Sequence, residues 1–156
     1  MVDRLSPEKR SWNMSRIRSG NTEPERKVRS ILHRLGYRFR LHRRDLPGSP
    51  DIVLPKHRLA IFVHGCFWHR HGCSYTYTPK SRQDFWLKKF LENTERDRIS
   101  QKALRSLAWK VAVIWECKTQ NGVSLAKSLQ YLIRKADSRF DAKPNKRKGK
   151  KERDNA

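Results

Sequence analysis

Residues 50–66, with the sequence PDIVLPKHRLAIFVHGC, decide the fold that this chain predicts. Two short apolar segments, at 50–54 and 58–64, stand on either side of the turn sequence Pro-Lys-His at 55–57. Short apolar runs separated by a turn are typical of paired strands, so we predict a β-hairpin. A turn centred on residues 56 and 57 would place Asp51 opposite Phe62.

This register puts a carboxylate at the start of an apolar strand. Asp51 would lie beside the Val63 carbonyl and close to His64. A carboxylate, a carbonyl oxygen and water are ligands that suit Mg²⁺, and such a cation can polarise a phosphodiester. His64 and His69 are then candidates for the general base or for a transition-state donor. The alternative is that Asp51 only caps the turn.

The rest of the chain predicts helices around two further strands. The predicted helices cover residues 6–18, 22–35, 81–107 and 123–135, and the predicted strands cover residues 37–42 and 109–116. The sequence does not decide whether the third of these helices is interrupted near residues 93–94. The segment WKVAVIWE at 109–116 is apolar on both faces, which is typical of a central strand. The order predicts an α/β fold with a mixed central sheet flanked by helices.

Composition narrows the class of protein. The 156 residues carry a formal net charge of +22, with 37 Lys and Arg against 15 Asp and Glu. The longest apolar run is far too short to span a membrane, so the composition excludes an integral membrane protein, a secreted disulfide scaffold and a collagen-like chain. Residues 143–156 hold seven basic and two acidic residues, so most of the positive charge belongs to the domain. We expect a nucleic acid partner.

Three cysteines and a histidine form a candidate zinc site. Cys66, His71 and Cys73 follow the spacing Cys-x4-His-x-Cys, and Cys117 comes just after the predicted central strand at 109–116. Thiolates and an imidazole in a group of four are the usual ligands of structural zinc. His64, His69 and His71 are the three candidates for the histidine ligand, and we choose His71. Cysteines without a common role are the alternative.

Two acidic residues allow a structural and a functional interpretation. Glu25 completes a Thr-x-x-Glu capping box with Thr22, which is a sufficient role for it. Asp97, in the sequence Glu-Arg-Asp-Arg at 95–98, is typical of a surface ion pair, but it could also orient a catalytic histidine.

Large aromatic side chains stand in a polar region. Phe67 and Trp68 lie inside the loop at 65–80, and Trp86 follows it with Phe85, so that one of these last two faces outward. Such rings could enter a base step of DNA, or they could pack over the zinc and in the core. Met14 in the basic first segment is either a packing residue or a second side chain that enters a base step. Phosphate or base contacts are candidate roles for Lys88, Lys89 and Asn93.

Together these residues resemble the very-short-patch-repair mismatch endonucleases. The motifs that carry the resemblance are Pro-Asp at 50–51, Ile-Phe-Val-His-Gly-Cys-Phe-Trp-His at 61–69, His71, Cys73, Phe-Trp-Leu at 85–87, Glu-Arg-Asp at 95–97, Trp-Glu-Cys at 115–117, Lys-Arg-Ser-Trp-Asn-Met at 9–14 and Thr22-x-x-Glu25. The resemblance covers about residues 6–135, and its contiguous block at 61–73 is highly specific.

The resemblance implies a restriction-endonuclease-like fold, a variant of the PD-(D/E)xK type, with a structural zinc loop. It also implies a Mg²⁺-dependent nick 5′ to the thymine of a T:G mismatch. The chain departs from the wider nuclease pattern, because Phe-Val-His at 62–64 stands where a second acid and a lysine are usual.

The resemblance further implies roles for single residues. Asp51 and the Val63 carbonyl would bind Mg²⁺, and His69 would be the general base, oriented by Asp97. His64 and Glu25 would have supporting roles near the metal and the phosphate. Zinc would be held by Cys66, His71, Cys73 and Cys117. The DNA-binding residues would be Met14, Phe67, Trp68, Trp86, Lys89 and Asn93, with the aromatic rings entering beside the mismatch from the major groove.

Three segments are expected along the chain: a basic DNA-contacting segment at 1–21, a nuclease domain at 22–136 and a basic, disordered tail at 137–156. The expected substrate is double-stranded DNA with a T:G mismatch, which arises when 5-methylcytosine deaminates. A DNA cytosine methyltransferase is therefore the expected functional companion, with mismatch-repair proteins as further candidates. We expect a monomer that is cytoplasmic and associated with the nucleoid. A zinc-stabilised DNA-binding module and a sequence-specific restriction-type nuclease are the alternatives.

Overall fold

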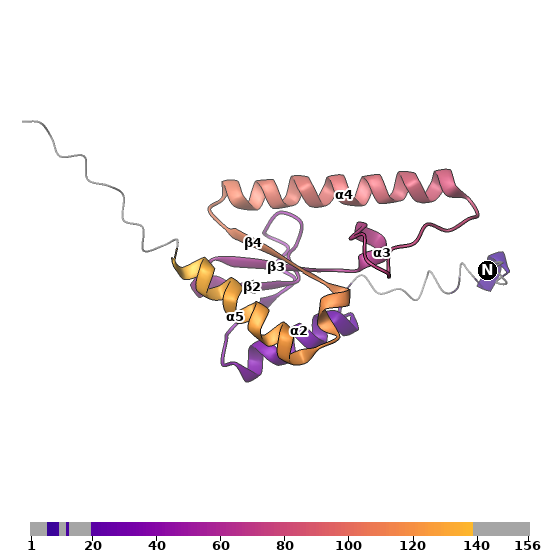
Figure 1. Ribbon diagram of the computed structural model, residues 1–156. Helices are drawn as coiled ribbons and strands as arrows, with labels where there is room; N and C mark the ends of the chain where they lie inside the picture. The colour runs from indigo at the N-terminus through magenta and orange to yellow at the C-terminus, as the bar shows by residue number, and fades with distance from the viewer. Residues whose placement is uncertain (1–5, 10–11, 13–19, 139–156) are drawn as a thin grey trace, which may run out of the picture.

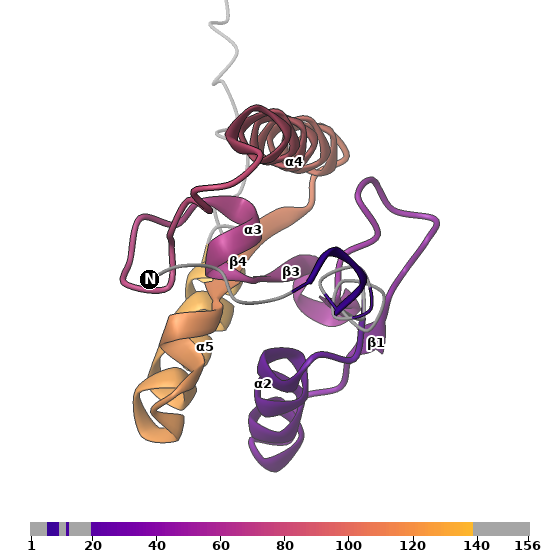
Figure 2. The same ribbon diagram turned by 90° about the vertical axis from the view of Figure 1, so that its right-hand side faces the viewer.

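A computed structural model of the protein describes residues 6–9, 12 and 20–138. In chain order the main elements are α2 (Glu23–Arg34), β1 (Arg40–Leu41), β2 (Ile52–Leu54), the 3₁₀ helix η1 (Pro55–His57), β3 (Leu59–His64), α3 (Cys66–His69), α4 (Gln83–Ser106), β4 (Lys110–Trp115), the 3₁₀ helix η2 (Glu116–Thr119) and α5 (Gly122–Ser138). Figures 1 and 2 show three layers, with α4 on one side of the sheet and α2 and α5 on the other. The predicted mixed α/β fold is confirmed.

The hairpin at the centre of the sheet has the predicted register. β2 and β3 are antiparallel, with Ile52 opposite Ile61 and Leu54 opposite Leu59. The turn between them is η1, and Arg58 closes it in a left-handed conformation with φ +45°. Asp51 therefore directly precedes the first paired residue, at the end of β2 that adjoins the C-terminal half of β3. This is the position that the sequence predicts for the carboxylate.

The core lies on both faces of the sheet. On one face, Val28 of α2 and Leu129 of α5 pack with Ile61. On the other face, Phe62 packs with Leu104 of α4. Neighbouring residues of β3 thus point into different halves of the core, as the alternation of a strand requires. Since both faces of the sheet are covered, packing fixes the position of the C-terminal end of β3. The residues that follow β3 therefore begin from a fixed position.

β4 is not the central strand that its sequence predicts. The sheet order of the described residues is β1-β2-β3-β4, so β4 lies at one end and pairs only with β3, in parallel. Its apolar character has a different cause. The helices α4 and α5 flank β4 in the sequence and cover its two faces, so both sets of side chains are shielded without a second neighbouring strand. The expected helical crossover between β3 and β4 is α4.

The long helix α4 has no interruption near Asn93 and Thr94. The Thr94 hydroxyl donates within the helix to the carbonyls of Phe90 and Leu91, and the Asn93 amide donates to the carbonyl of Trp68. Both polar side chains are therefore satisfied without breaking the helical backbone. The helix runs as one rod from the loop at 65–80 to the start of β4.

The predicted strand at 37–42 is much shorter in the structure, where only Arg40 and Leu41 pair with β2. The residues before them close α2 instead. Gly36 has φ +81°, and the Tyr37 N–H donates to the Leu32 carbonyl over 3.0 Å. This reversed turn is the usual end of a helix at glycine. The first residues of the predicted strand are thus part of the turn that ends α2.

The N-terminal segment is described only in part. Residues 7–9 and 12 are helical, and the Ser6 hydroxyl accepts a hydrogen bond from the Lys9 N–H, as expected for an N-cap. Met14 lies outside the described residues. No helix within the described ranges is long and apolar enough to cross a membrane.

Candidate active site

Asp51 is held at the junction of β2 and β3. Its Oδ2 accepts a hydrogen bond of 2.7 Å from the Val63 N–H. Burial, with a smaller contribution from the Glu25 carboxylate, raises the pKa of Asp51 to about 6, although the Val63 hydrogen bond and the charges of His42 and Arg29 oppose the shift. A divalent cation beside this carboxylate would offset the cost of its charge. The Val63 contact seen here is through the N–H group, and the role of the Val63 carbonyl as a metal ligand stays a prediction.

Two histidines and an aspartate follow directly from the end of β3. His64 is buried on the strand, and His69, at the end of α3, stacks on it with ring centroids 3.8 Å apart. Asp97 of α4 meets both rings. Its Oδ2 lies 2.5 Å from His69 Nδ1, and its Oδ1 lies 3.9 Å from His64 Nε2. This contact leaves Nε2 of His69 to accept a proton, as in other carboxylate-oriented imidazoles.

The environment of His64 keeps its ring neutral. Burial, with a smaller contribution from the neighbouring His69, lowers the pKa of His64 to about 4, although Asp97 opposes the shift. A neutral imidazole stacked on His69 can donate or accept one hydrogen bond without adding charge to the site. The pair therefore has one ring oriented by a carboxylate and one ring that remains uncharged near neutral pH.

Glu25 performs the capping role that the sequence predicts and also lies beside Asp51. Its N–H faces the Thr22 hydroxyl, and one carboxylate oxygen accepts from the Asn21 N–H over 3.0 Å. The same oxygen accepts from Arg29 over 2.7 Å. The side chain is only 3 % exposed, so its charge is compensated by these donors. The structural interpretation of Glu25 is thus confirmed, and its supporting role near a metal is compatible with this position.

Sequence reasoning missed His42 and Arg29. The structure groups His42 with Glu25 and Asp51 so closely that their ligand atoms lie within 4.8 Å of one another. Arg29 contacts both Glu25 and His42. No spacing in the sequence marks these residues, because His42 comes from an irregular segment and Arg29 resembles the other basic residues of α2.

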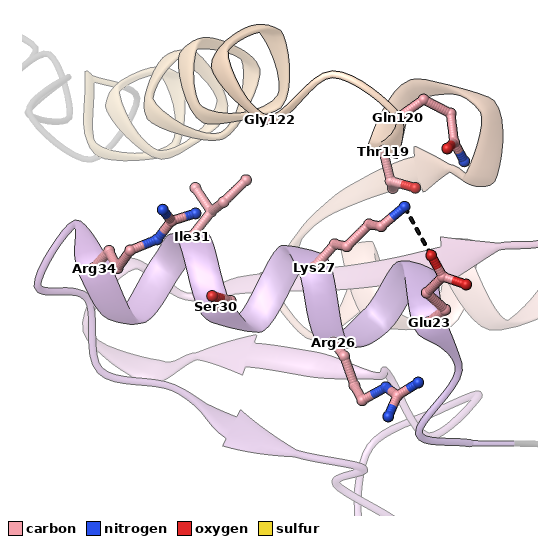
Figure 3. Close-up of a pocket in the computed structure, with 9 residues that line it drawn as sticks. All are labelled: Glu23, Arg26, Lys27, Ser30, Ile31, Arg34, Thr119, Gln120 and Gly122. Atoms are coloured by element: carbon pink, nitrogen blue, oxygen red, sulfur yellow. Dashed lines mark ion pairs between the residues drawn. The ribbon is translucent and has the colours of Figure 1, made fainter.

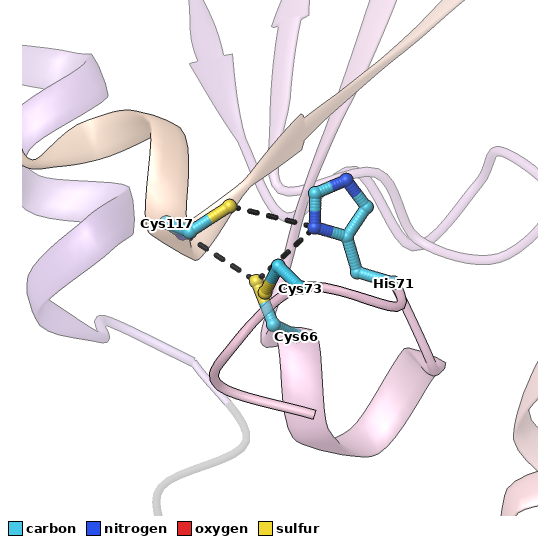
Figure 4. A group of neighbouring side chains, drawn as sticks. All are labelled: Cys66, His71, Cys73 and Cys117. Carbon is cyan, nitrogen blue, oxygen red and sulfur yellow. Dashed lines mark hydrogen bonds between the residues drawn. The ribbon is translucent and has the colours of Figure 1, made fainter. Parts of the chain in front are cut away.

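The four predicted zinc ligands converge in the structure. Figure 4 shows Cys66 from α3, His71 and Cys73 from the loop, and Cys117 from η2 around one point. His71 Nδ1 lies 3.7 Å from Cys66 Sγ and 3.4 Å from Cys117 Sγ. Ligands about 2.3 Å from a tetrahedral zinc ion are separated by distances of this size, so the donor set fits zinc. The cysteines form no disulfide among the described residues.

The aromatic side chains form one cluster between α3 and α4. Phe67 contacts Trp68, Trp86 and Phe90 with ring centroids 5.1–5.5 Å apart. Trp86 is only 8 % exposed, whereas Phe85 is exposed, so Phe85 is the residue of that pair that faces outward. Entry of Trp86 into a base step would require its ring to leave this cluster. Phe67 and Trp68 are half-buried, and Phe67, which also contacts Tyr77, joins the other rings.

Two hollows in the described surface lie away from these groups. One of about 410 Å³ lies between α2 and the start of α5, and Figure 3 shows Lys27 in it paired with Glu23. Another of about 600 Å³ lies between β4 and α5. Neither contains Asp51, His64 or His69. Neither hollow is therefore part of the candidate active site.

Comparisons with known proteins give the class and then the family. The family model described as DNA mismatch endonuclease Vsr matches residues 2–75. The chain is 53% identical to the type II nicking enzyme V.XorIIP of Xanthomonas oryzae pv. oryzae over 133 residues, which are 85% of this chain and 98% of that protein. It is 41% identical to the type II nicking enzyme V.NmeAIP of Neisseria meningitidis, over 86% of this chain and 96% of that protein.

The chain is also 42% identical to the DNA mismatch endonuclease Vsr of Escherichia coli, over 75% of each chain. With a half-buried carboxylate and an aspartate-oriented histidine at the end of the sheet, these similarities define a DNA endonuclease. The chain belongs to the Vsr family.

Proposed function

We propose that this endonuclease nicks one strand of double-stranded DNA 5′ to the thymine of a T:G mismatch, with Mg²⁺ as cofactor. The observation that carries the proposal is the meeting of two groups at adjacent residues of β3. Val63 holds the Asp51 carboxylate, and His64 begins the group that includes His69 and Asp97. A cation-binding carboxylate beside an oriented base is the arrangement that phosphodiester hydrolysis needs.

The residues of this chain have distinct roles in the proposed reaction. Nε2 of His69 accepts the proton of the water that attacks the phosphorus, while one phosphorus–oxygen bond of the strand breaks. Asp97 holds the His69 ring and stabilises its charged form. The neutral ring of His64 faces the same site. Mg²⁺, when bound at Asp51, would polarise the phosphodiester and lower the pKa of the attacking water.

The similarity to a relative that is named a mismatch endonuclease supports the T:G mismatch as the substrate. The similarity to relatives that are named nicking enzymes supports cleavage of a single strand. The aromatic cluster supports a physical mechanism. A ring that enters a base step must unstack it, at a cost of a few kcal/mol that is lower at a mismatched pair. Phe67 and Trp68 are the proposed wedge, with Trp86 behind them and Met14 from the other side.

We also propose a structural zinc ion at Cys66, His71, Cys73 and Cys117. The ion would fix the loop that supplies His69 at one end of α3 and the aromatic wedge within it. Lys89 and Asn93 lie on the next helix, where Asn93 holds the Trp68 carbonyl. Both are proposed to contact DNA near the mismatch.

The proposed partners follow from the substrate. A T:G mismatch arises where 5-methylcytosine deaminates, so a DNA cytosine methyltransferase is the proposed companion, and mismatch-repair proteins are further candidates. Because a single asymmetric mismatch needs only one active site, we propose that the protein acts as a monomer. Light scattering of the protein with and without DNA would measure its oligomeric state.

The test is a nicking assay on matched duplexes with T:G, T:A and C:G pairs in varied flanking sequences, with and without Mg²⁺. We expect nicks only in the T:G duplex, only in the strand that carries the mismatched thymine, and only with Mg²⁺. Asp51→Ala should bind the duplex without cutting it, whereas Asp45→Ala should retain activity because Asp45 pairs with Arg43 at the surface.

Three outcomes would contradict the proposal. Cutting of the T:A duplex at a defined sequence would indicate a restriction-type nuclease, and binding without any new strand end would indicate a DNA-binding module. Cutting by Asp51→Ala would disprove the proposed metal site.

A further inference from the structure

A polar group behind Asp51 consists of Asn21, Glu25, Arg29 and His42, of which Glu25 is buried and Arg29 and His42 are half-buried. Arg29 donates to Asn21 Oδ1 over 2.6 Å and to Glu25 Oε2 over 2.7 Å. A terminal nitrogen of the same guanidinium lies 2.9 Å from His42 Nε2. The side chain of Arg29 is 15 % exposed, so its contacts with Glu25 and His42 are partly shielded from water, whereas its contact with Asn21 is exposed. Among the described residues, the Nε atom of Arg29 is buried without a hydrogen-bond partner, so it is the terminal nitrogens of the guanidinium that make these contacts.

The Arg29 contact determines the tautomer of His42. A guanidinium has donors but no acceptor, so His42 Nε2 must accept the hydrogen bond and cannot carry a proton. In the neutral ring the proton is then on Nδ1. This nitrogen lies 3.9 Å from Asp51 Oδ1. His42 therefore directs an N–H group, and not a lone pair, toward the carboxylate.

The backbone also ties His42 to Asp51. The His42 N–H donates to the Asp51 carbonyl over 3.2 Å. The residue has φ +44°, a left-handed conformation that glycine and asparagine adopt more readily than histidine does. Its ring packs against Gly20, where an added Cβ would lie 3.2 Å from His42 Cε1. The imidazole is thus fixed by its backbone, by Gly20 and by Arg29.

We propose that Arg29 and His42 are positioning residues for the metal-binding carboxylate of Asp51. The Val63 N–H donates to Oδ2, and Nδ1 of His42 lies 3.9 Å from Oδ1, so His42 acts on that oxygen through the dipole of its N–H group and not through a direct hydrogen bond. Carboxylates that bind a metal need such partners, and loss of one typically lowers metal affinity about 10- to 100-fold. This inference rests on the proposed function, since it assumes that Asp51 binds a divalent cation.

The experiment measures Mn²⁺ binding to the full chain by electron paramagnetic resonance, alongside the Mg²⁺ dependence of nicking. His42→Gly and His42→Asn are a matched pair, because both residues tolerate φ +44° and both leave the Asp51 main-chain contact intact. The asparagine amide can place an N–H group where Nδ1–H stands, whereas glycine places none. Binding to T:G duplex without added divalent cation should be the same in the wild type and both variants.

We expect His42→Gly to weaken Mn²⁺ binding about 10-fold or more and to raise the Mg²⁺ concentration for half-maximal nicking by the same factor. His42→Asn should recover most of both. Equal Mn²⁺ affinity in the wild type and His42→Gly would overturn the inference, and so would equal losses in the two variants. If the wild type does not nick T:G duplexes, the proposed function fails, while the Mn²⁺ comparison still tests the role of His42.

Discussion

Asp51, Glu25 and Asp97 are three carboxylates that the fold holds by three kinds of donor. Asp51 has a main-chain N–H of the neighbouring strand, Glu25 has the capping box and Arg29, and Asp97 has the ring of His69. Each donor fixes the direction of an oxygen. The candidate site is therefore preorganised before a cation or DNA arrives, which is the condition for efficient catalysis at fixed groups.

At the residue scale, Asp97→Asn tests the orientation of the proposed base. The change removes the charge that stabilises protonated His69 and alters the contact with Nδ1. We expect the single-turnover nicking rate to fall about 10²- to 10⁴-fold, with DNA affinity unchanged. Glu95→Gln on the same helix is the control, because Glu95 pairs at the surface with Arg98. A rate for Asp97→Asn within twofold of the wild type would contradict this role.

At the scale of elements, the loop between β1 and β2 is fitted closely against α4. Gly48 has φ +73°, and a Cβ built there would lie 2.6 Å from Ser100 Cβ and 3.3 Å from Phe62 Cζ. The loop ends at Asp51, so its contact with α4 helps to set where β2 begins. Glycine is required at this position by conformation and by space together.

Gly48→Ala and Gly36→Ala separate these two requirements. Gly36 has a similar φ of +81°, but an added Cβ there would meet nothing within 4 Å. We expect Gly36→Ala to lower the free energy of unfolding by about 1 kcal/mol through backbone strain alone. Gly48→Ala should cost about 1–3 kcal/mol more, because α4 must also move. Chemical denaturation measures both values, and equal losses would show that α4 yields without cost.

The loop at 65–80 is the element for which the proposed zinc ion matters most. It contains one turn of helix, α3, and few buried apolar residues, although Cys66 is completely buried. Burial raises the pKa of the Cys66 thiol, and a cation that binds its thiolate would compensate this cost. We therefore expect the order of the loop to depend on the ion.

Cys117→Ser tests this dependence. The wild type should contain one zinc atom per chain by elemental analysis, and the variant should lose most of it and unfold at a lower temperature. Ser74→Ala, in the same loop but exposed, should retain the metal. A wild type without zinc, and with the same unfolding temperature as Cys117→Ser, would disprove the zinc site.

For the whole molecule, the net charge of +22 is the dominant property. Neutralising several phosphates releases counterions, so DNA affinity should fall by about 10³ or more when the salt concentration rises fourfold. A chain ending at residue 142 lacks seven basic residues of the tail. We expect it to keep T:G nicking but to bind DNA with a smaller salt slope, measured by fluorescence anisotropy. An unchanged slope would mean that the tail does not contact phosphate.

The sequence by itself determined the features that depend on local spacing. The Thr22 cap and the β2–β3 register are confirmed, because residue type and short-range geometry fix them, whereas the Glu25 carboxylate accepts from the Asn21 N–H and the Thr22 hydroxyl in place of the Thr22 N–H. The predicted helix at 123–135 is present as α5, which buries Leu125, Leu129 and Ile133 at helical spacing, while Leu132 is partly buried. The positions of Asp51 and His64 follow from the register alone.

Only the tertiary structure decided what surrounds these residues. Arg29 and His42 reach Asp51 because α2 and an irregular segment pack against the same strand end, and no local pattern records such a meeting. β4 has the composition of a central strand but lies at the end of the described sheet, because helices can shield both of its faces. An apolar pattern reports that a side chain is buried, whereas the packing of distant elements determines what buries it.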